Sequence, residues 1–115
     1  MAHWRKKQHL DPYFRLAKAE GYRARSAYKL LQIQEKFHIV RRGHVVVDLG
    51  AAPGSWSQVL RRLVGPQGRV IALDLNPIEP IPGVITLQGD MLDPDVQQRV
   101  IEMAGGRANV VVSDA

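Results

Sequence analysis

The hydrophobic positions of the chain follow two different periods, and together these predict alternating strands and helices. Continuous apolar runs, the pattern of strands buried on both faces, occupy residues 44–49, 69–75, 84–87 and 109–113. Apolar residues at helical spacing occupy segments before and between these runs, at residues 27–37, 55–64 and 95–103. The pattern therefore predicts an α/β fold whose parallel sheet is covered by helices on both faces.

Each predicted helix has an apolar face, and two of them begin at a residue suited to do so. Ser26 is a suitable N-cap for the first helix and Asp93 for the last, with Pro94 in its first turn. The residues expected on the buried faces are Ala27, Leu30, Leu31, Gln34 and Phe37 in the first helix and Trp56, Val59, Leu60 and Leu63 in the second. Arg61 and Arg62 are expected to point outward.

The two ends of the chain differ from this regular middle part. Residues 1–12 are basic and polar without an apolar period, and we expect them to form a mobile arm. A short helical turn is expected from residue 13 to residue 19, ended by Gly21. Only four strands are predicted, and nothing follows the last one to cover its outer edge. Residues 13–115 are therefore expected to be the N-terminal part of a longer domain, or to self-associate through that strand.

Charge is divided unevenly between the two halves of the chain. Residues 1–47 hold eleven Lys and Arg against three acids, whereas residues 48–115 hold five against eight. Such asymmetry is typical of a protein that binds a polyanion, although a solvated basic face remains the alternative. No apolar run approaches the ~18 residues of a membrane span, there is no signal peptide, and cysteine is absent. A cytoplasmic protein without membrane contact is the default expectation.

The most informative stretch is residues 45–57, with the sequence VVVDLGAAPGSWS. A strand, a tight small-residue loop and a helix in this order open a nucleotide-binding α/β sheet. The loop is not a dinucleotide fingerprint, since Pro53 removes a backbone N–H that a phosphate would need and Asp48 would repel a pyrophosphate. A cofactor that is cationic at this end fits better, and S-adenosylmethionine has sulfonium and ammonium groups.

Each predicted strand ends at an acid, and these four residues are Asp48, Asp74, Asp90 and Asp114. Ligands of parallel sheets bind at the carboxyl ends of the strands, so we expect the four carboxylates to line one site. Asp74 lies where an acid commonly meets ribose hydroxyls, and Asp90 could accept from an adenine amino group. A magnesium site is the rival interpretation. We favour the cationic nucleoside because the loop is poorly suited to phosphates, and we expect no metal.

Lys29 is a second candidate for chemistry, since it follows the basic residues Arg23 and Arg25 on an amphipathic helix. A lysine with a lowered pKa can act as a general base. An ordinary surface lysine is the alternative on this evidence alone.

Two motifs in this order, RARSAYKLL at residues 23–31 and DLGAAPGSWSQ at residues 48–58, resemble the FtsJ/RrmJ family of S-adenosylmethionine-dependent RNA 2′-O-ribose methyltransferases. The resemblance runs from about residue 11 to residue 115. It implies a Rossmann-like methyltransferase fold of which the first four strands are present.

The resemblance also implies roles for individual residues. Lys29 and Asp114 match the first Lys and the Asp of the family's catalytic Lys-Asp-Lys-Glu set. The cofactor is expected to contact Gly54, Trp56, Asp74, Asp90 and Asp114, together with Asp48, Gly50 and Pro53 of the loop. Arg23 and Arg25 are expected to hold RNA phosphates.

The family's second Lys and its Glu belong to a C-terminal half beyond residue 115, so we expect a cofactor-binding half with little or no activity. The expected substrate is a uridine of large-subunit (23S) ribosomal RNA, with the tRNA anticodon loop as the alternative. An inactive RNA-binding or cofactor-binding module is a further hypothesis. A nucleotide-dependent oxidoreductase is disfavoured by Ala52 and Pro53.

Overall fold

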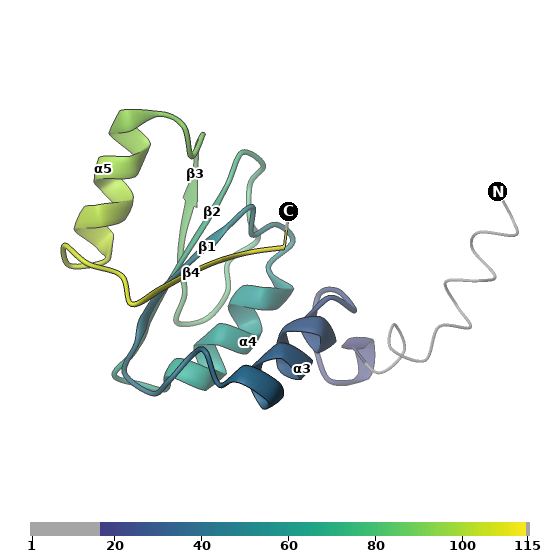
Figure 1. The fold of residues 1–115 in the computed structure, drawn as a ribbon. Coiled ribbons are helices and arrows are strands. Elements are labelled where there is room, and N and C mark those ends of the chain that lie inside the picture. Colours follow the sequence, from purple (N-terminus) through teal and green to yellow (C-terminus); the bar gives the residue numbers. More distant parts are fainter. Residues whose placement is uncertain (1–16, 115) are drawn as a thin grey trace, which may run out of the picture.

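The computed structural model of the chain describes residues 17–114 (Figure 1). The arm expected over residues 1–12, and most of the helical turn expected before Gly21, lie outside the described residues. Residues 17–19 of that turn are helical. The turn ends at Gly21, which has a φ of +82°, and the Tyr22 amide then donates to the Ala17 carbonyl at 2.8 Å.

The predicted helices and strands are all present, and no bound differs from its prediction by more than one residue. The helices are α3 (Ala27–Phe37), α4 (Ser55–Val64) and α5 (Pro94–Met103). The strands are β1 (Val45–Leu49), β2 (Arg69–Asp74), β3 (Ile85–Gln88) and β4 (Val110–Ser113). The Asp93 carboxylate accepts from the Asp95 amide at 2.9 Å, which confirms it as the N-cap of α5.

The four strands form one parallel sheet in the order β3-β2-β1-β4. From β1 the chain first moves outward to β2 and β3, and it then returns past β1 to add β4 on the other side. Because parallel crossovers are right-handed, this reversal places α4 and α5 on opposite faces of the sheet (Figure 1). The reversal also leaves a crevice between the ends of β1 and β4, where ligands bind in such sheets.

The main core lies between the sheet and α4, with α3 packed against α4 (Figure 1). Its buried members include Val46, Val70 and Val112 from the sheet, Ala27 and Leu30 from α3, and Val59, Leu60 and Val64 from α4. Strand alternation puts Asp48 on the same face as Val46, beneath the first turn of α4.

The other face of the sheet is covered by α5, which confirms that helices cover both faces. The cover is incomplete, because an apolar cavity of about 440 Å³ remains between α5 and the sheet. Among residues 17–114, no helix combines the length and the apolar character that crossing a bilayer requires. Strand β4 is an edge of the sheet, and self-association through it stays a prediction.

Phe37 is not on the buried side of α3, as its spacing predicts, but is 62% exposed. The side chain of Gln34 instead pairs with both backbone groups of Val40, at 2.6 and 3.0 Å. This pairing turns the chain back after α3, and Val40 enters the core with 3% exposure. The prediction for Phe37 was wrong because the Gln34 side chain binds the backbone of Val40, and Val40 is therefore buried in the core instead of Phe37.

The two arginines of α4 were expected to point outward; Arg62 is exposed and Arg61 is half-buried, and both also make specific contacts. Arg62 donates to the Tyr22 hydroxyl at 2.7 Å and lies 4.8 Å from the centre of that ring. Arg61 donates to the Gly68 carbonyl at 3.2 Å. Their charged groups therefore tie α4 to the segment before α3 and to the turn before β2.

Leu60 is a fully buried residue of α4 in the main core. We expect Leu60→Ala to lower the free energy of unfolding by about 2–5 kcal/mol. Its side chain is fully buried between α4 and the sheet, so truncation leaves a cavity. Urea denaturation followed by circular dichroism measures the change. Leu92→Ala is the matched control, since Leu92 is 78% exposed, and it should change stability by less than about 0.5 kcal/mol. Equal losses in the two variants would contradict the assignment of the core.

Candidate functional site

The four strand-ending acids gather at the carboxyl edge of the sheet, as the sequence predicts. Asp48 and Asp114 line one cavity of about 220 Å³, together with Trp56 and the loop over residues 50–53. Asp74 and Asp90 line a second cavity of about 90 Å³. Gly50 lines both cavities, so the two adjoin across the loop after β1.

The loop after β1 offers few backbone donors to a phosphate. The Ala51 amide donates to the Leu73 carbonyl at 3.0 Å, and the Ala52 amide donates to Asp74 Oδ2 at 2.9 Å. Pro53 has no N–H. Because successive amides at the tip are used or missing, the loop lacks the row of donors that cradles a pyrophosphate. This supports the inference that the site receives a cationic ligand.

The carboxylates of the second cavity also accept hydrogen bonds from backbone amides, a role that the sequence analysis did not predict. Asp74 Oδ1 accepts from the Asn76 amide at 2.8 Å, in addition to the bond from Ala52. Asp90 Oδ1 accepts from the Leu92 amide at 2.9 Å. These short-range bonds are typical of Asp in turns. A carboxylate has about four acceptor positions, so both residues keep capacity for a ligand.

Asp48 has an environment unlike that of the other three acids. Its side chain is 1% exposed, and its Oδ2 accepts from the Ser57 hydroxyl at 2.7 Å. Burial raises the pKa of Asp48 to about 6; the Ser57 hydrogen bond lowers it, and the charges of Asp114 and Asp74 raise it. Sequence reasoning missed Ser57, although a polar residue on the buried face of α4 was a usable signal.

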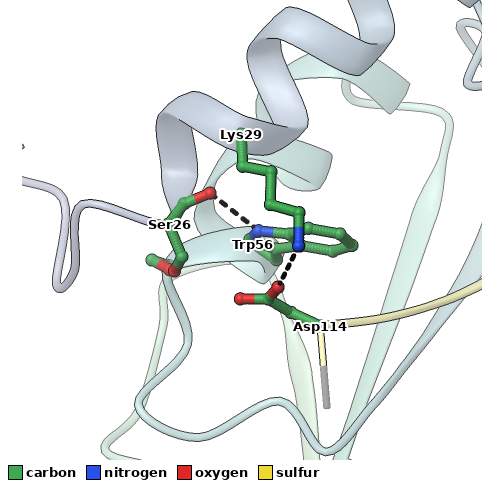
Figure 2. Close-up of polar contacts among 5 residues, drawn as sticks. Ser26, Lys29, Trp56 and Asp114 are labelled. Carbon is green, nitrogen blue, oxygen red and sulfur yellow. Dashed lines mark hydrogen bonds and ion pairs between the residues drawn. The ribbon is translucent and has the colours of Figure 1, made fainter.

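The fold brings Lys29 and Asp114 together from opposite ends of the described chain. Lys29 Nζ lies 3.3 Å from Asp114 Oδ1, and the two side chains are 65% and 30% exposed (Figure 2). Asp114 also lines the larger cavity of the carboxyl edge. The ion pair therefore places an ammonium group beside the acid-lined cavity, at its exposed side.

The segment before α3 is fastened directly to the start of α4. Trp56 Nε1 donates to the Ser26 carbonyl at 2.8 Å (Figure 2), and the hydroxyls of Ser26 and Ser55 lie 2.7 Å apart. Ser26 occupies the N-cap position of α3, but its side chain does not cap the helix. That part of the sequence prediction was wrong because the hydroxyl finds its partner on α4 instead.

The two arginines predicted to hold RNA phosphates differ in their surroundings. Arg25 is exposed and lines a separate cavity of about 260 Å³ with Tyr28 and Lys29. Arg23 directs its guanidinium to backbone carbonyls of two loops, Pro53 among them. Phosphate binding by either residue stays a prediction, and Arg23 has a second role in the fold.

The residues present fit a cationic nucleoside at the carboxyl edge. Neighbouring carboxylates repel one another, and the raised pKa of Asp48 reflects both burial and the charges of Asp114 and Asp74. A positive group in the larger cavity would relieve this repulsion. Gly54 does not line either cavity of this edge, and its contact with the cofactor stays a prediction. Among residues 17–114, no group of three or more His, Cys, Asp or Glu is arranged to hold a metal ion.

We expect Asp48→Asn to raise the free energy of unfolding at pH 8 by about 2 kcal/mol. The folded chain binds a proton on Asp48 more tightly than the unfolded chain does. Stability is therefore lost as pH rises from 3.8 to about 6, and the amide removes that loss. At pH 4 the variant should differ from the parent by less than about 1 kcal/mol.

Urea denaturation at the two pH values measures this effect. Asp95→Asn is the matched control, because Asp95 is an exposed acid of α5, and it should change stability by about 0.5 kcal/mol or less at either pH. A stability gain at Asp48 that is the same at pH 4 and pH 8 would contradict the assigned cause.

Comparison with known proteins agrees with this geometry. The family model described as FtsJ-like methyltransferase matches residues 22–115. A protein named ribosomal RNA large subunit methyltransferase E from Methanothrix thermoacetophila is 57% identical over 105 residues, which cover 91% of this chain and 40% of that protein. The protein of the same name from Methanoculleus marisnigri is 60% identical, with 91% and 51% covered. The chain thus spans about half the length of the curated relatives it matches.

The fold also matches a solved structure. A crystal structure of a ribosomal RNA methyltransferase from Plasmodium falciparum superposes with a TM-score of 0.73 at 29% identity, covering 82% of this chain and 56% of that one. The family model spans both motifs of the sequence and all four strand-ending acids. The chain therefore belongs to the FtsJ-like methyltransferase family.

Proposed function

We propose that this chain provides the methyl-donor site and the substrate-facing ion pair of an RNA 2′-O-ribose methyltransferase that uses S-adenosylmethionine. The observation that carries the proposal is the Lys29–Asp114 pair at the exposed side of an acid-lined cavity. The pocket would accept the cationic methyl donor, and the ammonium beside it would contact the ribose 2′-hydroxyl that receives the methyl group.

The cofactor would be held at both cavities of the carboxyl edge. Asp48 and Asp114 would face the sulfonium and ammonium groups, beside Gly50, Pro53 and Trp56 of the larger cavity. Asp74 and Asp90 would accept from the ribose hydroxyls and the adenine amino group in the smaller one. When bound, S-adenosylmethionine supplies a methyl group activated on sulfur. The site residues themselves contribute position and charge.

The reaction transfers a methyl group in line to the 2′-oxygen of a ribose. The new O–C bond forms as the C–S bond breaks, and the proton of the hydroxyl passes to solvent water. Asp114 orients the amine of Lys29, and this amine donates a hydrogen bond to the attacking oxygen. It thereby stabilises the negative charge that develops on that oxygen.

Two observations support an RNA substrate: basic residues at the α3 side of the site and the names of the related proteins. Arg25 and Lys29 lie next to one another at the α3 side of the site, where RNA phosphates would bind. The relatives are named for large-subunit ribosomal RNA, and we propose a uridine of that RNA as the acceptor. Such a substrate agrees with the cytoplasmic location expected from the sequence. The tRNA anticodon loop is the competing acceptor, and an inactive module that only binds RNA or cofactor is the competing function.

The purified chain is expected to bind S-adenosylmethionine saturably and not to bind NAD. Asp74→Asn should weaken binding by at least about tenfold, because it removes a charge that both shapes the loop and meets the cofactor. Lys29→Ala should weaken binding by less than about threefold, since the amine serves the substrate. Isothermal titration calorimetry measures both effects. Equal losses would contradict this division of roles, and no binding of S-adenosylmethionine would favour the RNA module.

RNA affinity is expected to fall steeply with salt, because phosphate contacts release counterions. Arg25→Gln should reduce the slope of log K against log salt by about 0.7–0.9. Arg99→Gln is the matched control, since Arg99 is exposed on α5, and it should leave the slope unchanged. Fluorescence anisotropy with a large-subunit ribosomal RNA fragment and with a tRNA anticodon stem-loop measures the slopes. Tighter binding of the anticodon stem-loop would overturn the choice of ribosomal RNA.

A further inference from the structure

Arg23 connects the loop after β1 to the loop between β2 and β3 through hydrogen bonds of its side chain. Its Nη1 donates to the Pro53 carbonyl at 2.9 Å and to the Glu79 carbonyl at 2.6 Å. Its Nη2 donates to the Pro80 carbonyl at 2.7 Å. One guanidinium thus satisfies three backbone acceptors, one on the loop after β1 and two on the loop between β2 and β3.

The backbone of Arg23 is held just as specifically. Its amide donates to Gln58 Oε1 at 2.9 Å, and Gln58 Nε2 donates to the Gly21 carbonyl at 3.0 Å. Gln58 belongs to α4, whose inner face is part of the main core. The guanidinium therefore reaches the two loops from a backbone position that is hydrogen-bonded to α4.

Gly54 shows how closely the two loops approach one another at this point. A Cβ on Gly54 would lie 2.7 Å from Ile81 Cδ1 and 3.2 Å from Arg23 Nη1, and its φ is +116°. Ile81 is itself 6% exposed. Only glycine allows the loop after β1 to pack this tightly under Ile81 and Arg23. This is a steric reason for Gly54, which lines neither cavity of the carboxyl edge.

We propose that Arg23 is a positioning residue for the methyl-donor site: it fixes the Pro53 wall of the larger cavity to the loop over residues 76–83. The proposal rests on the proposed function, because it assumes that this cavity receives S-adenosylmethionine. A planar guanidinium can serve three carbonyls at fixed angles, whereas a lysine ammonium is a point charge that cannot. Arg23 thus acts on cofactor affinity through the loop, without touching the cofactor.

The exchange of Arg23 for lysine separates this role from phosphate binding. Arg23→Lys keeps the positive charge but loses the planar set of guanidinium donors, and Arg23→Gln loses both the charge and that set of donors. We expect each variant to weaken S-adenosylmethionine binding by about tenfold in calorimetry, with thermal midpoints close to that of the parent. Arg23→Lys should leave the salt slope of RNA binding unchanged. Arg99→Gln, the exposed control on α5, should bind S-adenosylmethionine within about twofold of the parent.

Amide hydrogen exchange provides a readout that does not depend on the cofactor. In Arg23→Gln, exchange should accelerate at residues 54–55 and at Glu79 and Ile81, and it should stay unchanged in β1 and in the middle of α4. Parent-like S-adenosylmethionine affinity in Arg23→Lys, or unchanged exchange in the two loops of Arg23→Gln, would overturn the proposal. If the parent itself binds no S-adenosylmethionine, the proposed function fails, and the exchange pattern still decides whether Arg23 fastens the loops.

Discussion

The carboxyl edge of the sheet depends on the hydrogen bonds that β2 makes to the loop after β1. The Leu73 carbonyl accepts a hydrogen bond from the Ala51 amide, and the Asp74 carboxylate accepts one from the Ala52 amide. The loop therefore follows the end of the neighbouring strand. This attachment uses the donors that a phosphate would need and leaves carboxylates at the rim. These hydrogen bonds therefore determine the shape of the rim of the site.

The main cost at this edge is the burial of the Asp48 carboxylate, and the charges of Asp114 and Asp74 add to it. The Asp48 carboxylate is buried with one hydroxyl partner, and its pKa rises to about 6 because the charged form is poorly solvated. A cation in the adjoining cavity would lower that pKa again and recover part of the lost stability. Because the folded chain binds the Asp48 proton more tightly than the unfolded chain does, the charged carboxylate lowers the stability of the folded chain above about pH 6.

The N-terminal segment contributes to the site through its attachment to α4 rather than to the sheet. Ser26 and Arg23 contact the first turns of α4 and the loop before it, and Lys29 then reaches Asp114 at the end of β4. The N-terminal segment thus reaches the site along α4, whereas the four acids lie at the ends of the strands.

The sequence by itself determined the helices and strands, the parallel sheet and the gathering of Asp48, Asp74, Asp90 and Asp114, because period and strand direction are local properties of the chain. It did not reveal the Ser57 partner of Asp48, the burial of Val40 in place of Phe37, or the carbonyls that Arg23 bridges. Each of these features is a specific side-chain contact, made between segments close in the sequence by Gln34 and Ser57 and between distant segments by Arg23. Only the tertiary structure decided them, since single side-chain contacts of this kind leave no periodic trace in the sequence.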